Sequence, residues 1–171
     1  MAQIMAERYT GASIKRSEDP RILTGAGRYV DDIKLPGMLH AAFVRSPLAH
    51  ARVLKVNVSA AQALPGVVAV LTGADLASMT IPGPDALLAM MGGPGPTPEY
   101  TLLGTDKVRF VGDPVAVVIA ESRYLAEDGC DLVEVEYEDL PPVATAAAAL
   151  EAGSPPLFAN LGNNIASPRN R

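Results

Sequence analysis

The run Pro114-Val-Ala-Val-Val-Ile-Ala120 is the most hydrophobic segment of the chain, and it limits the possible folds more than any other feature. A short apolar run bounded by turn residues is typical of a buried strand, and Gly112 and Asp113 directly precede this one. Seven residues are far too few for a membrane span, which needs about 18 apolar residues. We therefore predict that this run is the central strand of a sheet inside a folded domain.

The residues that follow this run show two clear periodicities. Ser122 can cap a helix whose apolar residues recur at helical spacing as far as Leu132. Gly129 lies inside that helix, where glycine costs about 1 kcal/mol relative to alanine, so we predict that the helix approaches the sheet closely there. From Val133 to Glu138 apolar and acidic residues alternate, which predicts a strand with three carboxylates on its solvent face.

Three more strands are predicted nearer the N-terminus, over residues 39–44, 51–58 and 67–71. In the second of them every other residue from Leu54 to Val58 is apolar, which predicts that these side chains face the core. The third is apolar throughout, which predicts burial on both faces. Strands interspersed with short helices indicate the α+β class, with a mixed sheet and a few packed helices.

Composition divides the chain into an arm, a domain and a second arm. Residues 1–16 have no periodicity and are predicted to be an N-terminal arm, and residues 17–150 are predicted to form the domain. Within the domain, residues 77–101 are predicted to be a long loop, because nine of the seventeen residues in 82–98 are Gly or Pro. Residues 151–171 are predicted to be a C-terminal arm.

Charge and residue counts exclude several classes of function. The chain has 14 basic and 19 acidic residues, a net charge of −5, without a basic run, so we predict no nucleic-acid partner. One cysteine and two histidines are too few for a closed Cys/His metal site or a disulfide framework. Glu7 and Arg8 stand where a signal peptide would have its apolar core, and no stretch reaches the length of a membrane span, so we predict a cytoplasmic protein.

The sequence contains no convincing catalytic, cofactor-binding or metal-binding set. Gly25-Ala26-Gly27 begins like a dinucleotide fingerprint, but Val30 replaces the third glycine. Asp31 and Asp32 are adjacent, so their side chains point apart in extended backbone, and a capping turn explains them better than a cation site. Cys130 lies near the apolar side of its helix beside two aspartates, where a cysteine behaves as a small hydrophobe.

Seven polar or flexible residues remain as candidates for an interface. Arg45, His50 and Arg52 gather around a strand break without an acid–base partner nearby in the sequence, so an external partner or a solvated turn would explain them. His40 and His50 have no neighbouring ligands, which favours structural roles. A methionine pair in the Gly/Pro-rich loop fits either a partner surface or a local plug. The predicted interface comprises Asp31, Asp32, Arg45, His50, Arg52, Met90 and Met91.

Six motifs carry a resemblance to a known family. They are Glu18-Asp-Pro-Arg-Ile-Leu-Thr-Gly-Ala-Gly-Arg-Tyr-Val-Asp-Asp32, Leu35-Pro-Gly-Met-Leu-His40, Phe43-Val-Arg-Ser-Pro-Leu-Ala-His-Ala-Arg52, Leu64-Pro-Gly-Val-Val-Ala-Val70, Val108-Arg-Phe-Val-Gly-Asp-Pro-Val-Ala116 and Leu132-Val-Glu-Val-Glu-Tyr-Glu-Asp-Leu-Pro-Pro142. In this order they resemble the N-terminal α/β-hammerhead domain of the molybdenum-binding large subunit in the xanthine dehydrogenase, aldehyde oxidase and carbon monoxide dehydrogenase family. The match covers about residues 14 to 166, and its spacing resembles the carbon monoxide dehydrogenase branch most.

The resemblance implies hydroxylation of an aldehyde, a heteroaromatic ring or carbon monoxide, with water as the oxygen source. In that family molybdopterin and the general base lie in a larger region after the hammerhead domain, while FAD and 2Fe-2S clusters lie on other domains or subunits. No part of that region matches residues 1–171, so we predict that this chain alone binds no cofactor and is inactive. It would supply structure and an interface to the molybdopterin-binding region and to FAD and iron–sulfur subunits. The alternative is a stand-alone interaction or small-ligand-binding module without a redox role.

Overall fold

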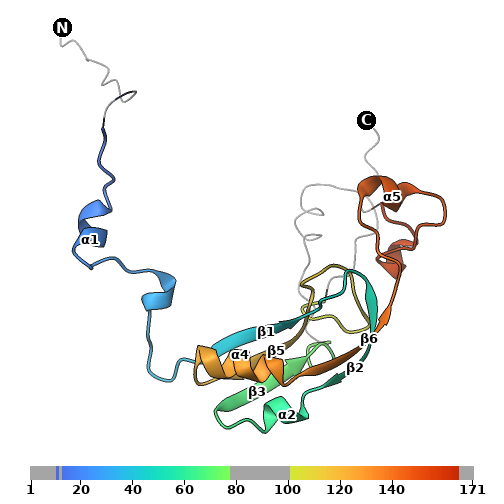
Figure 1. Ribbon diagram of the computed structural model, residues 1–171, viewed down its shortest axis with the longest axis horizontal. Coiled ribbons are helices and arrows are strands. Elements are labelled where there is room, and N and C mark those ends of the chain that lie inside the picture. Colours follow the sequence, from blue (N-terminus) through green and yellow to red (C-terminus); the bar gives the residue numbers. More distant parts are fainter. Residues whose placement is uncertain (1–10, 12, 78–100, 166–171) are drawn as a thin grey trace. The chain divides into compact units, whose positions relative to one another are not determined.

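The structure, a computed structural model, describes residues 11, 13–77 and 101–165 and divides into two compact units (Figure 1). The first unit spans Met1–Met38 and the second spans Leu39–Arg171. The first contains the helix α1 (Asp19–Leu23) and the 3-10 helix η1 (Val30–Asp32). Pro20 stands at the start of α1, where the missing N–H costs no hydrogen bond.

The second unit holds all the strands that the structure describes. Its elements, in chain order, are β1 (His40–Arg45), β2 (Ala51–Asn57), α2 (Ser59–Gln62), β3 (Val67–Thr72), β4 (Lys107–Val108), β5 (Pro114–Ala120), α4 (Arg123–Asp131), β6 (Glu134–Asp139), α5 (Ala146–Leu150) and the 3-10 helix η2 (Ala159–Leu161). No helix in the described ranges is long and apolar enough to cross a membrane.

The strands form two antiparallel sheets of three strands each. One has the order β1-β5-β3 and the other the order β4-β2-β6, and every described pairing is antiparallel. The α+β class and the central position of β5 are therefore confirmed, while the predicted mixed sheet is wrong. The separation into two sheets begins at the break after β1. The amide N–H of Ser46 donates to the carbonyl oxygen of Asp113 at 2.9 Å, and the chain then enters the second sheet instead of continuing in the first.

Two predictions of strand burial are corrected by the structure. Leu54 is 58% exposed, because the register between β2 and β6 shifts between Val53 and Lys55 and a bulge turns the intervening side chain outward. Strand β3 lies at a sheet edge with Val68 55% exposed, so it is not buried on both faces. Both errors arise because strand pairing, which the local pattern does not specify, sets burial.

Helix α4 forms as predicted and lies along β1 and β5 (Figure 1). The hydroxyl oxygen of Ser122 accepts a hydrogen bond from the amide N–H of Leu125 at 3.2 Å and so caps the helix. Gly129 is buried, and a β-carbon there would lie 2.8 Å from Cγ1 of Val118 on β5. The predicted close approach of helix and sheet is confirmed. Cys130 packs beside Val118 as a small hydrophobe, as predicted.

Three glutamates of β6 face solvent, as their alternation predicted, and each meets a residue on β2. The side-chain Nδ2 of Asn57 donates to a carboxylate oxygen of Glu134 at 3.0 Å. Glu136 lies 3.8 Å from Nζ of Lys55, and Glu138 lies 3.0 Å from Nε of Arg52. Exposed pairs of this kind contribute between zero and about 1 kcal/mol each. These acids therefore align two strands and are not acid–base machinery.

Candidate functional site

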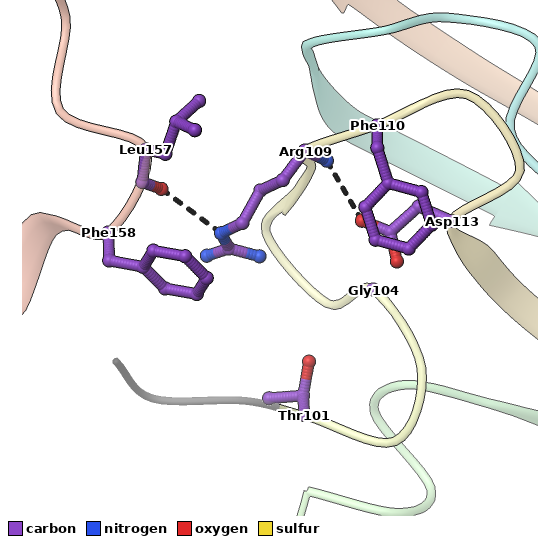
Figure 2. A pocket seen from close by; sticks show the side chains of 7 residues that line it. All are labelled: Thr101, Gly104, Arg109, Phe110, Asp113, Leu157 and Phe158. Carbon is purple, nitrogen blue, oxygen red and sulfur yellow. Dashed lines mark hydrogen bonds between the residues drawn. The ribbon is translucent and has the colours of Figure 1, made fainter. Parts of the chain in front are cut away.

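A pocket of about 230 Å³ lies beside the connection between β4 and β5. Its lining residues are Thr101, Gly104, Arg109, Phe110, Asp113, Leu157 and Phe158 (Figure 2). The first five flank the short strand β4 and the turn before β5, and the last two come from the C-terminal segment. The pocket thus lies where residues about 50 positions apart in the sequence meet.

Arg109 joins the two sides of the pocket. Its Nε donates to the carbonyl oxygen of Leu157 at 3.0 Å, and its guanidinium carbon lies 4.8 Å from the centroid of the Phe158 ring (Figure 2). One terminal nitrogen donates to the carbonyl oxygen of Lys107 at 3.2 Å, and the other lies 3.6 Å from a carboxylate oxygen of Asp106. The Arg109 side chain is only 17% exposed, so these contacts are partly shielded from water.

Two further side chains hold the C-terminal segment in place. Nζ of Lys107 donates to the carbonyl oxygen of Pro156 at 3.1 Å. Burial lowers the pKa of Lys107, and the nearby Arg109 cation lowers it further. Asn164 accepts a hydrogen bond from the amide N–H of Leu157 at 2.8 Å and donates to the carbonyl oxygen of Pro155 at 3.1 Å. A network of side chain to backbone bonds therefore fixes residues 154–164 against β4.

Asp113 organises the opposite wall of the pocket. Its carboxylate accepts a hydrogen bond from the amide N–H of Arg109 at 2.8 Å, which closes the turn between β4 and β5 (Figure 2). Burial raises the pKa of Asp113, although this hydrogen bond and the Arg109 charge act in the opposite direction. The pocket therefore offers a guanidinium group, a partly buried carboxyl group and two aromatic rings. This combination suits the binding of a side chain or a small ligand.

The described ranges provide no metal centre: in residues 13–77 and 101–165 no three His, Cys, Asp or Glu side chains gather as a metal site would require. The thiol of Cys130 does not suit nucleophilic chemistry, because burial raises its pKa and the neighbouring Asp131 raises it further. These residues do not fit a resident metal, and we derive no catalytic step from them.

The structure places the first predicted interface residues, Asp31 and Asp32, in η1 of the first unit. A carboxylate oxygen of Asp32 accepts a hydrogen bond from the amide N–H of Tyr29 at 2.8 Å. The capping role that the sequence favoured over a cation site is thus confirmed for Asp32. Met90 and Met91 lie outside the described residues.

Arg45 and Arg52 have no acid–base partner nearby in the sequence, as the sequence indicated, but both have partners in the tertiary structure. Arg52 pairs with Glu138, and a terminal nitrogen of Arg45 donates to the carbonyl oxygen of Gly112 at 2.9 Å. The partners lie 67 or more residues away in the sequence, so a search among neighbouring residues could not find them. The interface itself remains a prediction.

His50 has the structural role that its lack of neighbouring ligands favoured. Its ring is only 4% exposed, and Nδ1 lies 2.7 Å from the carbonyl oxygen of Pro141. A carbonyl oxygen can only accept, so Nδ1 carries a hydrogen and donates it to Pro141. Nε2 is buried without a hydrogen-bond partner in the described structure.

Sequence reasoning missed Arg109, Asp113, Phe158 and Asn164, which together shape the pocket and its C-terminal wall. The available signal was weak. Arg109 and Asp113 flank a predicted turn, and Phe158 and Asn164 are the ordinary residues of an arm rich in Gly, Pro and Asn. Nothing in the local pattern indicates that these two segments meet.

Comparison with known proteins shows similarity to one family of oxidoreductase large subunits. The family model described as "Aldehyde oxidase and xanthine dehydrogenase, a/b hammerhead domain" matches residues 24–141. The chain is 45% identical over 143 residues to the nicotine 6-hydroxylase large subunit of Paenarthrobacter nicotinovorans, covering 84% of this chain and 17% of that protein. It is 44% identical over 155 residues to the carbon monoxide dehydrogenase large chain of Afipia carboxidovorans, covering 91% of this chain and 18% of that protein.

Solved structures agree with these relatives. Quinoline 2-oxidoreductase from Pseudomonas putida 86 is similar with a TM-score of 0.76 and 44% identity, covering 92% of this chain and 20% of that chain. Carbon monoxide dehydrogenase from Oligotropha carboxidovorans is similar with a TM-score of 0.70 and 44% identity, covering 85% of this chain and 17% of that chain. The chain therefore spans 17 to 20% of the length of these four proteins.

Proposed function

The chain belongs to the family of the aldehyde oxidase and xanthine dehydrogenase α/β-hammerhead domain, and on this basis we propose that it is the non-catalytic hammerhead part of a molybdopterin-dependent hydroxylase or dehydrogenase. The observation that supports this proposal most is the joint coverage. A carbon monoxide dehydrogenase large chain matches 91% of this chain, while this chain matches only 18% of that protein. A chain with this coverage suits the role of one domain within a larger catalytic assembly.

In this role the chain provides structure and an interface, and its partners provide the chemistry. We propose that it meets a molybdopterin-binding region or subunit, and through it FAD and iron–sulfur components. The substrate would be carbon monoxide, an aldehyde or a heteroaromatic ring. The network around Arg109 supports a positioning role, because it fixes the backbone of residues 154–164. Of the predicted interface residues, we propose that Asp31, Asp32, Arg45, Arg52, Met90 and Met91 contact the partner, and that the buried His50 supports this surface from inside the domain.

The pocket beside Arg109 favours a second candidate function, a stand-alone module that binds a small ligand or a peptide side chain. About 230 Å³ is below the range of about 300 to 1,000 Å³ that is usual for sites of drug-sized ligands. The pocket alone therefore supports this alternative less well than the family coverage supports the first.

Purification of the native protein that contains this chain would test the proposed function. An affinity tag is added at the chromosomal locus, and molybdenum is measured by mass spectrometry together with the identity of every polypeptide present. We expect about one molybdenum atom per copy of the chain, together with a region that resembles the rest of the large subunit. A preparation that holds the chain without molybdenum would contradict the proposal and favour the stand-alone module.

A further inference from the structure

Four exposed side chains lie at the end of β1 and on the turn before β5. Phe43 is 48% exposed, Phe110 is 56% exposed, Val111 is 65% exposed, and Arg45 is also exposed. We call these four residues the Arg45 surface. Phe110 also lines the pocket described above, so the surface adjoins it.

Arg45 connects the two segments of this surface. Its guanidinium carbon lies 5.6 Å from the centroid of the Phe43 ring, and one terminal nitrogen donates to the carbonyl oxygen of Gly112 at 2.9 Å. Arg45 therefore lies between the Phe43 ring and the turn that carries Phe110 and Val111. Its side chain is held by these contacts although it is exposed to solvent.

The backbone beneath the Arg45 surface is fixed by hydrogen bonds. The amide N–H of Gly112 donates to the carbonyl oxygen of Ser46 at 2.8 Å, and the amide N–H of Ser46 donates to the carbonyl oxygen of Asp113 at 2.9 Å. Gly112 has a φ of +93°, a conformation that only glycine adopts readily, so the turn depends on this residue. A rigid surface loses little conformational entropy when a partner binds it.

The charge of the surface indicates the chemistry of its partner. No carboxylate lies within 4.0 Å of the Arg45 guanidinium group in residues 13–77 and 101–165, although the whole chain has a net charge of −5. A held cation beside exposed aromatic and aliphatic groups is typical of an interface centre, where Arg and aromatic residues are enriched. A carboxylate on a partner would complete a charge-assisted pair with Arg45.

We propose that the Arg45 surface binds a segment that presents a carboxylate beside an apolar side chain. This partner segment lies on the large-subunit region outside residues 1–171, so its identity rests on the proposed function. The carboxylate would take up the remaining N–H donors of Arg45, and the apolar side chain would cover Phe43, Phe110 and Val111. Both interactions exclude water from the guanidinium group and strengthen its pairing.

A zero-length cross-link tests this arrangement in the native protein. Arg45→Lys places a primary amine at the same position, and a carbodiimide then joins that amine to any carboxylate in contact with it. Mass spectrometry identifies the product. Lys55 and Glu136, which lie 3.8 Å apart, provide an internal control because their cross-link should form in every sample. We expect position 45 to join to an aspartate or glutamate of the large-subunit region.

Two results would overturn the proposal: no cross-link from position 45 while the Lys55 control forms, or a cross-link only to a carboxylate within residues 1–171. If molybdenum is present in either case, the proposed function stands and only the Arg45 surface fails. If position 45 joins to another protein in a preparation without molybdenum, the proposed function and the identity of the partner both fail.

The apolar part of the surface needs its own variant. In the Arg45→Lys background, Phe43→Ser should lower the yield of the cross-link from position 45 several-fold, because water would then reach the contact. Tyr124→Ser is the matched control, since Tyr124 is a 77% exposed aromatic residue on α4. It should leave the yield unchanged. Equal yields in the two variants would contradict the apolar contribution.

Discussion

The guanidinium carbon of Arg109 lies 4.8 Å from the centroid of the Phe158 ring, and Nε of the same side chain donates to the carbonyl oxygen of Leu157. Strand β4 has only two residues and could hold little by itself. Arg109 therefore connects the second sheet, β4-β2-β6, to the C-terminal segment that carries Leu157 and Phe158. The contact between Arg109 and Phe158 holds this C-terminal segment in a fixed position against the domain.

Arg109→Ala should destabilise the chain by about 2 to 4 kcal/mol. The variant loses two charge-assisted hydrogen bonds to backbone carbonyls and a partly shielded cation–π contact. Urea unfolding measures the change in free energy of unfolding, and hydrogen exchange should show faster exchange of the Leu157 amide. Arg52→Ala is the control: it removes an exposed pair with Glu138 and should cost less than about 1 kcal/mol. Equal losses in the two variants would refute the role of Arg109.

Gly129→Ala should destabilise the chain by about 1 to 3 kcal/mol even though alanine favours helices. The new β-carbon would meet Cγ1 of Val118 at 2.8 Å, and a valine on the central strand has little freedom to move. Thermal unfolding measures the loss. Glu127→Ala, at an exposed position of the same helix, should change stability by less than about 0.5 kcal/mol. Adding Val118→Ala should recover part of the Gly129→Ala loss in a double-mutant cycle, and strict additivity would contradict the clash.

As pH rises above about 4, the ordinary pKa of an aspartate, Asp113→Asn should gain stability relative to the wild type. Burial raises the pKa of Asp113 in the folded chain above about 3.9, the value of an exposed aspartate. The folded chain then binds more protons than the unfolded chain between the two pKa values. The stabilising contribution of protonated Asp113 is present below about pH 3.9 and is lost as pH rises through the folded pKa. Asparagine stays neutral and can keep the acceptor for the Arg109 amide.

Urea unfolding of both proteins at several pH values measures this difference. Asp128→Asn, at an exposed position on α4, is the matched control and should show no such trend. A stability difference between Asp113→Asn and the wild type that does not vary with pH would be evidence against a raised pKa.

Cys130 should react slowly with a disulfide reagent near pH 8 in the folded chain. Burial and the adjacent Asp131 raise the pKa of its thiol, so little thiolate is present, and the side chain packs beside the Val118 cluster. The reaction rate is compared with that of the same chain unfolded in urea, where the single cysteine is accessible. We expect unfolding to accelerate the reaction at least about tenfold. Similar rates would show that the thiol is not protected.

The purified 171-residue chain should bind neither molybdenum nor flavin nor iron. It has one cysteine, whereas an iron–sulfur cluster takes four, and it has no complete glycine-rich phosphate loop. Metal analysis and a visible absorption spectrum check this expectation. A stoichiometric metal or a flavin band would refute it and would show that this chain holds a cofactor.

Local patterns in the sequence determined most of the elements of this protein. The apolar run 114–120 gave the central strand, Ser122 gave the start of α4, and the alternation of residues 133–138 gave the exposed acids. These features depend on interactions within a few residues or on one-sided burial. They are therefore present in the sequence before the chain folds. The family resemblance also came from ordered short motifs, and the match to residues 24–141 confirms it.

Only the tertiary structure decided how these elements combine. Separation into two antiparallel sheets, the outward turn of Leu54 and the edge position of β3 follow from strand pairing across long stretches of chain. The partners of Arg45, Arg52 and Arg109 likewise lie far away in the sequence. The alternation of apolar and polar residues along a strand indicates which side chains share a face. Their burial and hydrogen bonding depend on the segment that covers that face. That segment is chosen by the packing of the whole domain.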